Sequence, residues 1–253
     1  MDTQRFFGGD GAELVFREAG EGEGRPLIML PGFAGGGARM FEYGRGGAFG
    51  IRGRRVVVPD FRGHGDSARP HDRGAYPADV LADDVLALVR HLGFADGEYD
   101  LGGYSLGGRV VVRALVRGAR PRRAVVAGQG LAKVCGPQTG GSNHRMLTAL
   151  VAGDELEAGS AEARMAQWLE TLGADPQALL LVLESLVATS EEELAAISVP
   201  TLVVIGDADE RSDADQLAVR MGDARFVMVP GDHGGAFSSP ELAAAVSGFL
   251  AGE

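Results

Sequence analysis

The sequence predicts an α/β fold built on a mostly parallel sheet with helices on both faces. Short apolar runs rich in β-branched residues alternate along the chain with longer amphipathic stretches, which is the pattern of a parallel sheet covered by helices. Each short run ends in a loop that contains Gly or Pro, as expected at the end of a strand. A chain of 253 residues suits one such domain with a modest insertion.

The individual elements follow from periodicity. Core strands are predicted at 27–30, 55–59, 99–102, 123–127, 201–205 and 225–229. Helices are predicted where apolar residues recur at spacings of three and four, at 78–92, 106–117, 213–221 and 240–250. Asp79, Asp83 and Asp84 load the first half of the first of these helices with acid, which suits a helix N-terminus. The polar and apolar alternation over 13–18 predicts an antiparallel edge strand.

From about residue 128 to residue 194 the alternation of strands and helices stops. This segment is rich in Ala, Leu and Glu and predicts several helices, among them 160–171 and 176–187. A helical insertion between two core strands fits this pattern better than a second domain. We therefore divide the chain into a first part of the core (1–127), a helical cap or lid (128–194) and a second part of the core (195–253).

Composition excludes several classes of protein. The formal net charge of −11 argues against a general nucleic-acid binder, because such proteins need clustered Lys and Arg to displace counterions from phosphates. Cys135 is the only cysteine, so no intrachain disulfide forms. No apolar run approaches the roughly 20 residues that cross a bilayer, and the first ten residues lack the pattern of a signal peptide. We expect a cytoplasmic protein with neither nucleic-acid nor membrane partners.

The segment Gly-Tyr-Ser-Leu-Gly-Gly at 103–108 carries the main chemical signal. It lies between a predicted strand and a predicted helix, which is the context that the nucleophile-elbow motif requires. The turn is so tight that residues flanking Ser105 must be nearly without side chains, while Ser105 is strained at its tip. Its hydroxyl is then exposed at a helix N-terminus, where developing negative charge is stabilised. Ser105 is the predicted nucleophile; the alternative is a Gly-rich turn without chemistry.

A serine nucleophile needs a base, and the base needs a carboxylate to orient it. The expected chain order is Ser, acid, His. His233 is the predicted base because it lies in the loop after the last predicted strand, whereas His144 lies in the insertion. The acid is expected after the preceding strand. Asp209 is preferred because the loop needs a few residues to turn back toward His233, and Asp207 stays open as an alternative.

Two backbone N–H groups are needed to stabilise the oxyanion. One is expected from Leu106, directly after the nucleophile, and the other from Phe33, in the Gly-rich loop after the first parallel strand. Gly32 before Phe33 allows the backbone to approach closely. The alternative is a flexible Gly turn.

Taken in order, these segments resemble the α/β-hydrolase superfamily, specifically its small, capped esterase, lactonase and C–C-bond hydrolase branch. The resemblance covers nearly the whole chain and rests on residues 103–108, on Asp-Phe-Arg-Gly-His-Gly-Asp-Ser at 60–67, on Pro-Thr-Leu-Val-Val-Ile-Gly-Asp-Ala-Asp at 200–209, and on His233 followed by Pro240 and Phe249-Leu250. It implies an α/β-hydrolase fold with a helical cap, a supporting rather than catalytic His64, and Asp209 as the triad acid. The sequence departs from the family in having Pro31-Gly32 where His-Gly is common, which changes the hydrogen bonding of that loop.

The function that this implies is hydrolysis of a small to medium ester-type substrate, a carboxylic ester or a lactone, through an acyl-enzyme on Ser105. The same residues serve C–C-bond or thioester hydrolysis and acyl transfer, and a ligand-binding or signalling module with a slow triad is an alternative of another class. No metal or organic cofactor is required. Candidate substrate-binding residues are Tyr104 beside the nucleophile and Met146 and Trp168 in the insertion. The oligomeric state is not predicted.

Overall fold

A computed structural model describes residues 3–22, 24–43, 53–137 and 139–252. The strands are β1 (Thr3–Phe7), β2 (Glu13–Ala19), β3 (Gly24–Leu30), β4 (Arg54–Asp60), β5 (Asp100–Tyr104), β6 (Ala124–Ala127), β7 (Thr201–Gly206) and β8 (Ala224–Val229). The helices are α1 (Gly37–Tyr43), α2 (Val80–His91), α3 (Leu106–Val116), α4 (Leu131–Cys135), α5 (Ser142–Ala152), α6 (Ala161–Thr171), α7 (Pro176–Ser185), α8 (Glu191–Ala195), α9 (Ala214–Arg220) and α10 (Pro240–Ala251), with short 3₁₀ turns η2 (Arg73–Ala75) and η3 (Ala236–Ser238).

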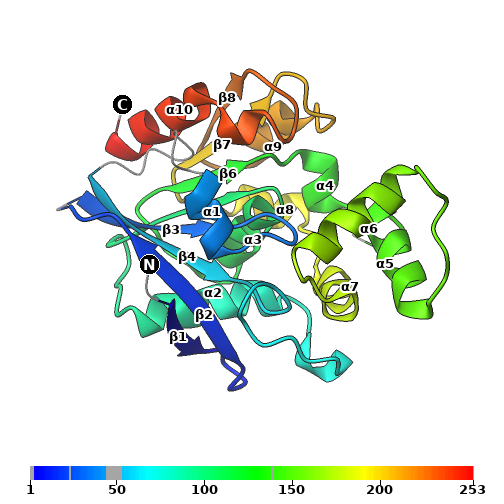
Figure 1. Cartoon of the computed structure of the whole chain (residues 1–253). Coiled ribbons are helices and arrows are strands. Elements are labelled where there is room, and N and C mark those ends of the chain that lie inside the picture. Colours follow the sequence, from blue (N-terminus) through cyan, green and yellow to red (C-terminus); the bar gives the residue numbers. More distant parts are fainter. Residues whose placement is uncertain (1–2, 23, 44–52, 138, 253) are drawn as a thin grey trace.

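The described strands form one eight-stranded sheet in the order β1-β2-β4-β3-β5-β6-β7-β8 (Figure 1). From β4 to β8 all neighbours are parallel, whereas β2 is antiparallel to both β1 and β4. The predicted α/β fold with a mostly parallel sheet is confirmed. Because parallel strands all end at the same edge, the loops after β3, β5, β7 and β8 gather there.

One expectation about the sheet is wrong. Residues 13–18 were expected to form its edge, but β2 is paired on both sides and β1 lies outside it. Of the five residues of β1, only Phe6 is buried. A strand with one buried side chain leaves no alternating pattern in the sequence, so β1 could not be predicted from periodicity.

Alternate residues of the central strands face two separate apolar layers. Ile28 and Leu30 of β3 pack in a cluster with α2, α3 and α9, whereas Leu27 and Met29 pack in another with α1 and α10. Side chains of a strand alternate between the two faces of the sheet, so each face packs against its own helices and is buried from water. The core is therefore a helix, sheet and helix sandwich that fixes the strand ends.

Helices α4–α8 connect β6 to β7. Within this connection, α5, α6 and α7 share an apolar cluster of their own and stand to one side of the sheet (Figure 1). Its buried members are Met146, Leu147, Leu169, Leu179 and Leu183. The shorter α4 packs on α9, and α8 packs on α3 and α9, so both lie against the core. Among the described helices, none has both the length and the apolar character that crossing a membrane demands.

Candidate active site

Ser105 lies at a sharp turn between β5 and α3. Its backbone has φ 55° and ψ −118°, a conformation that is costly for a residue with a side chain. The turn is tight enough to exclude side chains on either side. A Cβ on Gly103 would lie 2.3 Å from the Gly107 carbonyl, and one on Gly107 would lie 2.2 Å from the Leu30 carbonyl oxygen. Close packing of β3, β5 and α3 thus dictates both glycines and holds Ser105 at the tip.

The side chains of Ser105, His233 and Asp209 form one hydrogen-bonded chain. His233 Nε2 is 3.0 Å from Ser105 Oγ, and His233 Nδ1 is 2.6 Å from Asp209 Oδ2. We assign the ring proton to Nδ1, since a carboxylate only accepts; Nε2 then accepts from the serine hydroxyl. Asp207 instead accepts from the Gly231 amide at 2.9 Å. Of the two candidate acids, Asp209 is therefore the one that reaches His233.

The carboxylate of Asp209 is kept charged by its neighbours. Burial by itself raises the pKa of this group, but hydrogen bonds from His233 and from the Arg211 amide hold the pKa below its usual range. Arg211 Nη1 also donates to Asp209 Oδ1 at 3.0 Å and lies 2.8 Å from His233 Nδ1. A carboxylate whose pKa is held low stays ionised near neutral pH, which suits the orientation of a base.

The loop after β3 runs alongside Ser105. A Cβ on Gly32 would lie 3.6 Å from Ser105 Cβ, so this backbone passes directly beside the serine. Within the described ranges, the amides of Phe33 and Leu106 donate no hydrogen bond to the protein. Both amides are therefore available as donors, one directly after Ser105 and one directly after Gly32.

Asp60, at the end of β4, holds this loop in place through hydrogen bonds. Its buried carboxylate accepts from the Gly37 amide at 2.6 Å, from Arg17 at 2.9 Å and from the Asp66 amide at 2.9 Å. The contact with Gly37 sets the start of α1, which the sequence did not predict. A Cβ on Gly36 would lie 2.8 Å from the same carboxylate.

Other groups contact the backbone of the site, and sequence reasoning missed these roles. Gln129 Nε2 donates to the Ser105 carbonyl at 2.5 Å, and the Tyr104 hydroxyl donates to the His233 carbonyl at 2.6 Å. Gln129 follows β6 directly, so the rule that parallel strands place polar residues at their ends could have found it. Tyr104 was proposed to bind substrate, but it is 6% exposed and packs behind His233.

The remaining predicted residues lie on α5 and α6. Met146 is 1% exposed in the cluster of α5, α6 and α7, which packs against Phe33, whereas Trp168 is 40% exposed. His144 lies on α5, 3.6 Å from Glu184. In the described part of the chain, no group of three His, Cys, Asp or Glu side chains is arranged to hold a metal ion.

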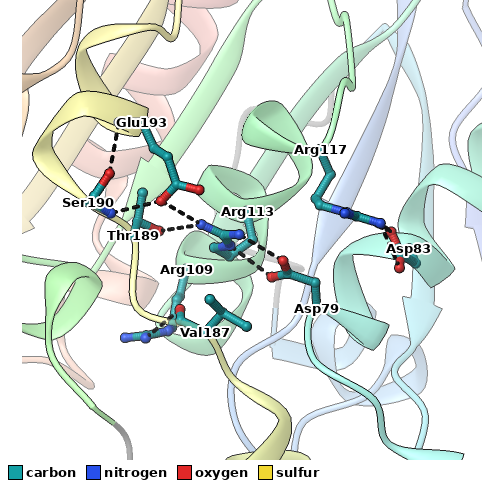
Figure 2. Close-up of polar contacts among 9 residues, drawn as sticks. All are labelled: Asp79, Asp83, Arg109, Arg113, Arg117, Val187, Thr189, Ser190 and Glu193. Atoms are coloured by element: carbon teal, nitrogen blue, oxygen red, sulfur yellow. Dashed lines mark hydrogen bonds and ion pairs between the residues drawn. The ribbon is translucent and has the colours of Figure 1, made fainter.

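The helix that begins at Leu106 is fastened by three arginines, Arg109, Arg113 and Arg117 (Figure 2). Arg113 binds Asp79 through two hydrogen bonds of 2.7 and 2.8 Å, and Arg117 pairs with Asp83 at 2.9 Å. Asp79 and Asp83 are thus bound to α3, whereas Asp84 of α2 pairs with Arg62. Asp79 is the N-cap residue of α2 and Asp83 lies in its first turn, as expected, although the Asp79 side chain makes no capping hydrogen bond.

Among the described residues, Arg109 differs from the other two in having only carbonyl oxygens as hydrogen-bond partners. It is 1% exposed and donates to the carbonyl oxygens of Lys133, Gly136 and Val187. Burial, and then the nearby charge of Arg113, lower its pKa to about 10. This side chain therefore ties the start of α3 to both ends of the α5–α7 segment.

The comparisons with known proteins agree with this architecture. The sequence model of the alpha/beta hydrolase family matches residues 27–246. The chain belongs to this family. Within the alpha/beta hydrolases, the AB hydrolase superfamily protein YisY of Bacillus subtilis (strain 168) is 28% identical over 214 residues, which is 77% of this chain and 78% of that protein.

Solved alpha/beta hydrolase structures superpose over the whole chain. A hydrolase from Pseudomonas aeruginosa PA01 has a TM-score of 0.79 at 22% identity, covering 100% of this chain and 99% of that one. An esterase from Exiguobacterium antarcticum has a TM-score of 0.76 at 19% identity, covering 99% and 100%. At such low identities these similarities establish the fold and leave the substrate open.

Proposed function

We propose that the protein is a serine hydrolase that cleaves a small to medium ester-type substrate, a carboxylic ester or a lactone. The observation that carries this proposal is the chain of contacts from Ser105 Oγ through His233 to Asp209, with separations of 3.0 and 2.6 Å. Membership of the alpha/beta hydrolase family supports it, and so does the similarity in fold to a protein described as an esterase.

The acylation step uses groups already in contact. His233 Nε2 takes the proton of Ser105 as Oγ attacks the ester carbonyl carbon. The carbonyl oxygen becomes an oxyanion, which the N–H groups of Phe33 and Leu106 stabilise. Asp209 keeps the imidazole in the required tautomer and stabilises its positive charge. His233 then gives the proton to the leaving alcohol, and the acyl group remains on Ser105.

Deacylation repeats these roles with water. His233 removes a proton from water, the hydroxide attacks the acyl carbon, and the oxyanion forms again between the same two amides. Collapse of this intermediate releases the carboxylic acid and returns the proton to Ser105. In this scheme helices α5–α7 act as a cap, because their apolar cluster packs against Phe33 and Ala34. These two residues belong to the loop between β3 and α1 (31–36), which we call the oxyanion loop. Met146 and Trp168 belong to that cap.

The proposal is tested with Ser105→Ala. We expect this variant to lose turnover of p-nitrophenyl acetate by about 10⁴-fold or more, and to lose labelling by a fluorophosphonate probe, because no other group supplies the nucleophile. Ser142→Ala is the matched control, an exposed serine at the start of α5, and should be labelled like the wild type. Undiminished hydrolysis by Ser105→Ala would disprove the mechanism.

The choice of acid is tested in the same assay. Asp209→Asn removes the carboxylate that orients His233 and should lower kcat by several orders of magnitude. Asp207→Asn keeps an oxygen for the Gly231 amide and should stay near wild-type activity. The reverse result would assign the acid to Asp207.

A further inference from the structure

A cavity of about 160 Å³ lies beside the oxyanion loop. It is bounded by residues 34–36 of that loop, by residues 63–66 after β4, and by Leu172, Ala174 and Leu179 of the α6–α7 region. We call it the loop pocket. Gly32 lies against Ser105. Ala34, in the wall of the pocket, is two residues farther along the chain, and two residues span at most about 7 Å.

The charged groups of the loop pocket leave it positive in a strongly acidic protein. Arg17, Arg39 and Arg69 line it together with Asp60 and Asp66. Both carboxylates form ion pairs with Arg17. Three arginines against two aspartates leave one net positive charge, although the chain carries −11. An anion entering this site meets attraction where most of the surface repels it.

Two of these arginines have no carboxylate partner among the described residues. Arg69 donates to the carbonyl oxygens of Gly173 and Gly65, which do not neutralise its charge. Arg39, on α1, makes no ion pair or hydrogen bond within the described chain. A partly buried guanidinium without an acid is poised to receive one, because a charge-assisted hydrogen bond to a carboxylate is about twice as strong as a neutral one.

His64 lies in the wall of the same pocket. It is 2% exposed, and its Nε2 atom has no hydrogen-bond partner. Its Nδ1 faces the Arg62 carbonyl oxygen at 3.1 Å, so Nδ1 carries the proton and Nε2 presents a lone pair. A carboxylate only accepts hydrogen bonds and cannot pair with this atom, so the anion is assigned to the arginines alone.

We propose that the loop pocket binds a free carboxylate of the substrate, held by Arg39 and Arg69, and that the natural ester or lactone is therefore an acidic one. The apolar wall of Leu172, Ala174 and Leu179 fits a short hydrocarbon chain between this carboxylate and the reacting carbonyl. A volume of 160 Å³ is below the roughly 300–1,000 Å³ of sites for drug-sized ligands, so it takes one small group. The inference rests on the proposed esterase function of Ser105.

The test compares charge on otherwise matched esters. In the first pair, mono-p-nitrophenyl glutarate carries a carboxylate at the end of its acyl chain, and p-nitrophenyl valerate has a neutral end there. In the second pair, 4-acetoxybenzoate carries a carboxylate on its leaving group, and phenyl acetate has a neutral leaving group. We expect the wild type to favour the charged member of one pair in kcat/KM by about tenfold or more. Arg39→Glu should abolish that preference. Arg90→Glu makes the same change of net charge at an exposed position of α2, across the sheet from α1, and should keep the preference.

A binding measurement separates failure of this inference from failure of the proposed function. Glutarate, at constant ionic strength, should raise the melting temperature of the wild type and of Ser105→Ala by about 2 °C or more, and should not raise that of Arg39→Glu. If esters are hydrolysed through Ser105 but Arg39→Glu changes neither the preference nor the glutarate shift, the pocket assignment is wrong. If glutarate binds through Arg39 but Ser105→Ala still hydrolyses esters, the assignment stands and the serine mechanism fails.

Discussion

His64 is a histidine that the folded protein keeps neutral. Burial lowers its pKa to about 4, the hydrogen bond to the Arg62 carbonyl and the charge of Asp60 act in the opposite direction, and the charge of Arg69 lowers the pKa further. An unfolded histidine titrates near pH 6.5. Between these values the unfolded chain binds a proton that the folded protein does not. The folded state therefore loses stability as the pH falls from about 6.5 toward 4.

This difference predicts a measurable share of the acid sensitivity. A shift from about 6.5 to about 4 corresponds to roughly 3 kcal/mol. His64→Asn can still donate to the Arg62 carbonyl but cannot titrate. Between pH 7 and pH 4, the free energy of unfolding should fall by up to about 3 kcal/mol less in this variant than in the wild type, as measured by urea denaturation. An equal fall in both proteins would contradict the explanation.

Single residues also show what a sequence can and cannot reveal about the site. Ser105, Asp209 and His233 follow predicted strands, and the structure brings these three side chains together. Gln129 and Tyr104 donate hydrogen bonds to backbone carbonyls of other segments. Whether these bonds form depends on how loops that are distant in sequence meet. The place of Gln129 at a strand end could have been read from the sequence, whereas the carbonyl that each side chain contacts could not.

At the scale of secondary structure, the elements with a regular apolar period were predicted and those stabilised by distant partners were not. The central strands and the helices α2, α3, α9 and α10 bury a full face and lie within a few residues of the expected ranges. By contrast, α1 begins at Gly37, where the Asp60 carboxylate accepts a hydrogen bond from the Gly37 amide. That long-range hydrogen bond leaves no local pattern.

The attachment of α3 gives a prediction for this scale. Arg109→Met removes donors from three carbonyl groups, those of Lys133, Gly136 and Val187. Leaving buried carbonyls unpaired should lower the free energy of unfolding by about 3–5 kcal/mol, measured by urea denaturation.

Arg117→Met on the same helix is the matched control. Arg117 pairs with Asp83 while 47% exposed, so its loss should cost under about 1 kcal/mol. If the two variants are destabilised equally, Arg109 does not tie the segments together in the way proposed.

For the whole molecule, burial is uneven across the sheet. Every residue of β5, β6 and β7 is buried. The outermost strands are exposed: β1 buries only Phe6, and β8 buries only Val229. The sheet therefore has a dry centre and two accessible edges.

Hydrogen exchange should follow this gradient. Amides of β5, β6 and β7 open only by global unfolding and should exchange slowest, whereas those of β1 and β8 should exchange through local opening at least about tenfold faster. Exchange followed by mass spectrometry on peptides from each strand measures this. Equal protection of β8 and β6 would show that the edges unfold only together with the core.

The contacts of Arg109 have a consequence for how this protein can change. The carbonyl oxygens of Gly136 and Val187 accept hydrogen bonds from the same guanidinium nitrogen of Arg109, so the chain between them leaves the core and returns at a single point. Such a closed excursion can be lengthened, shortened or exchanged for another without altering the register of β6 and β7. Under the proposed function, new substrates could be acquired by replacing this one segment while Ser105, Asp209 and His233 keep their places.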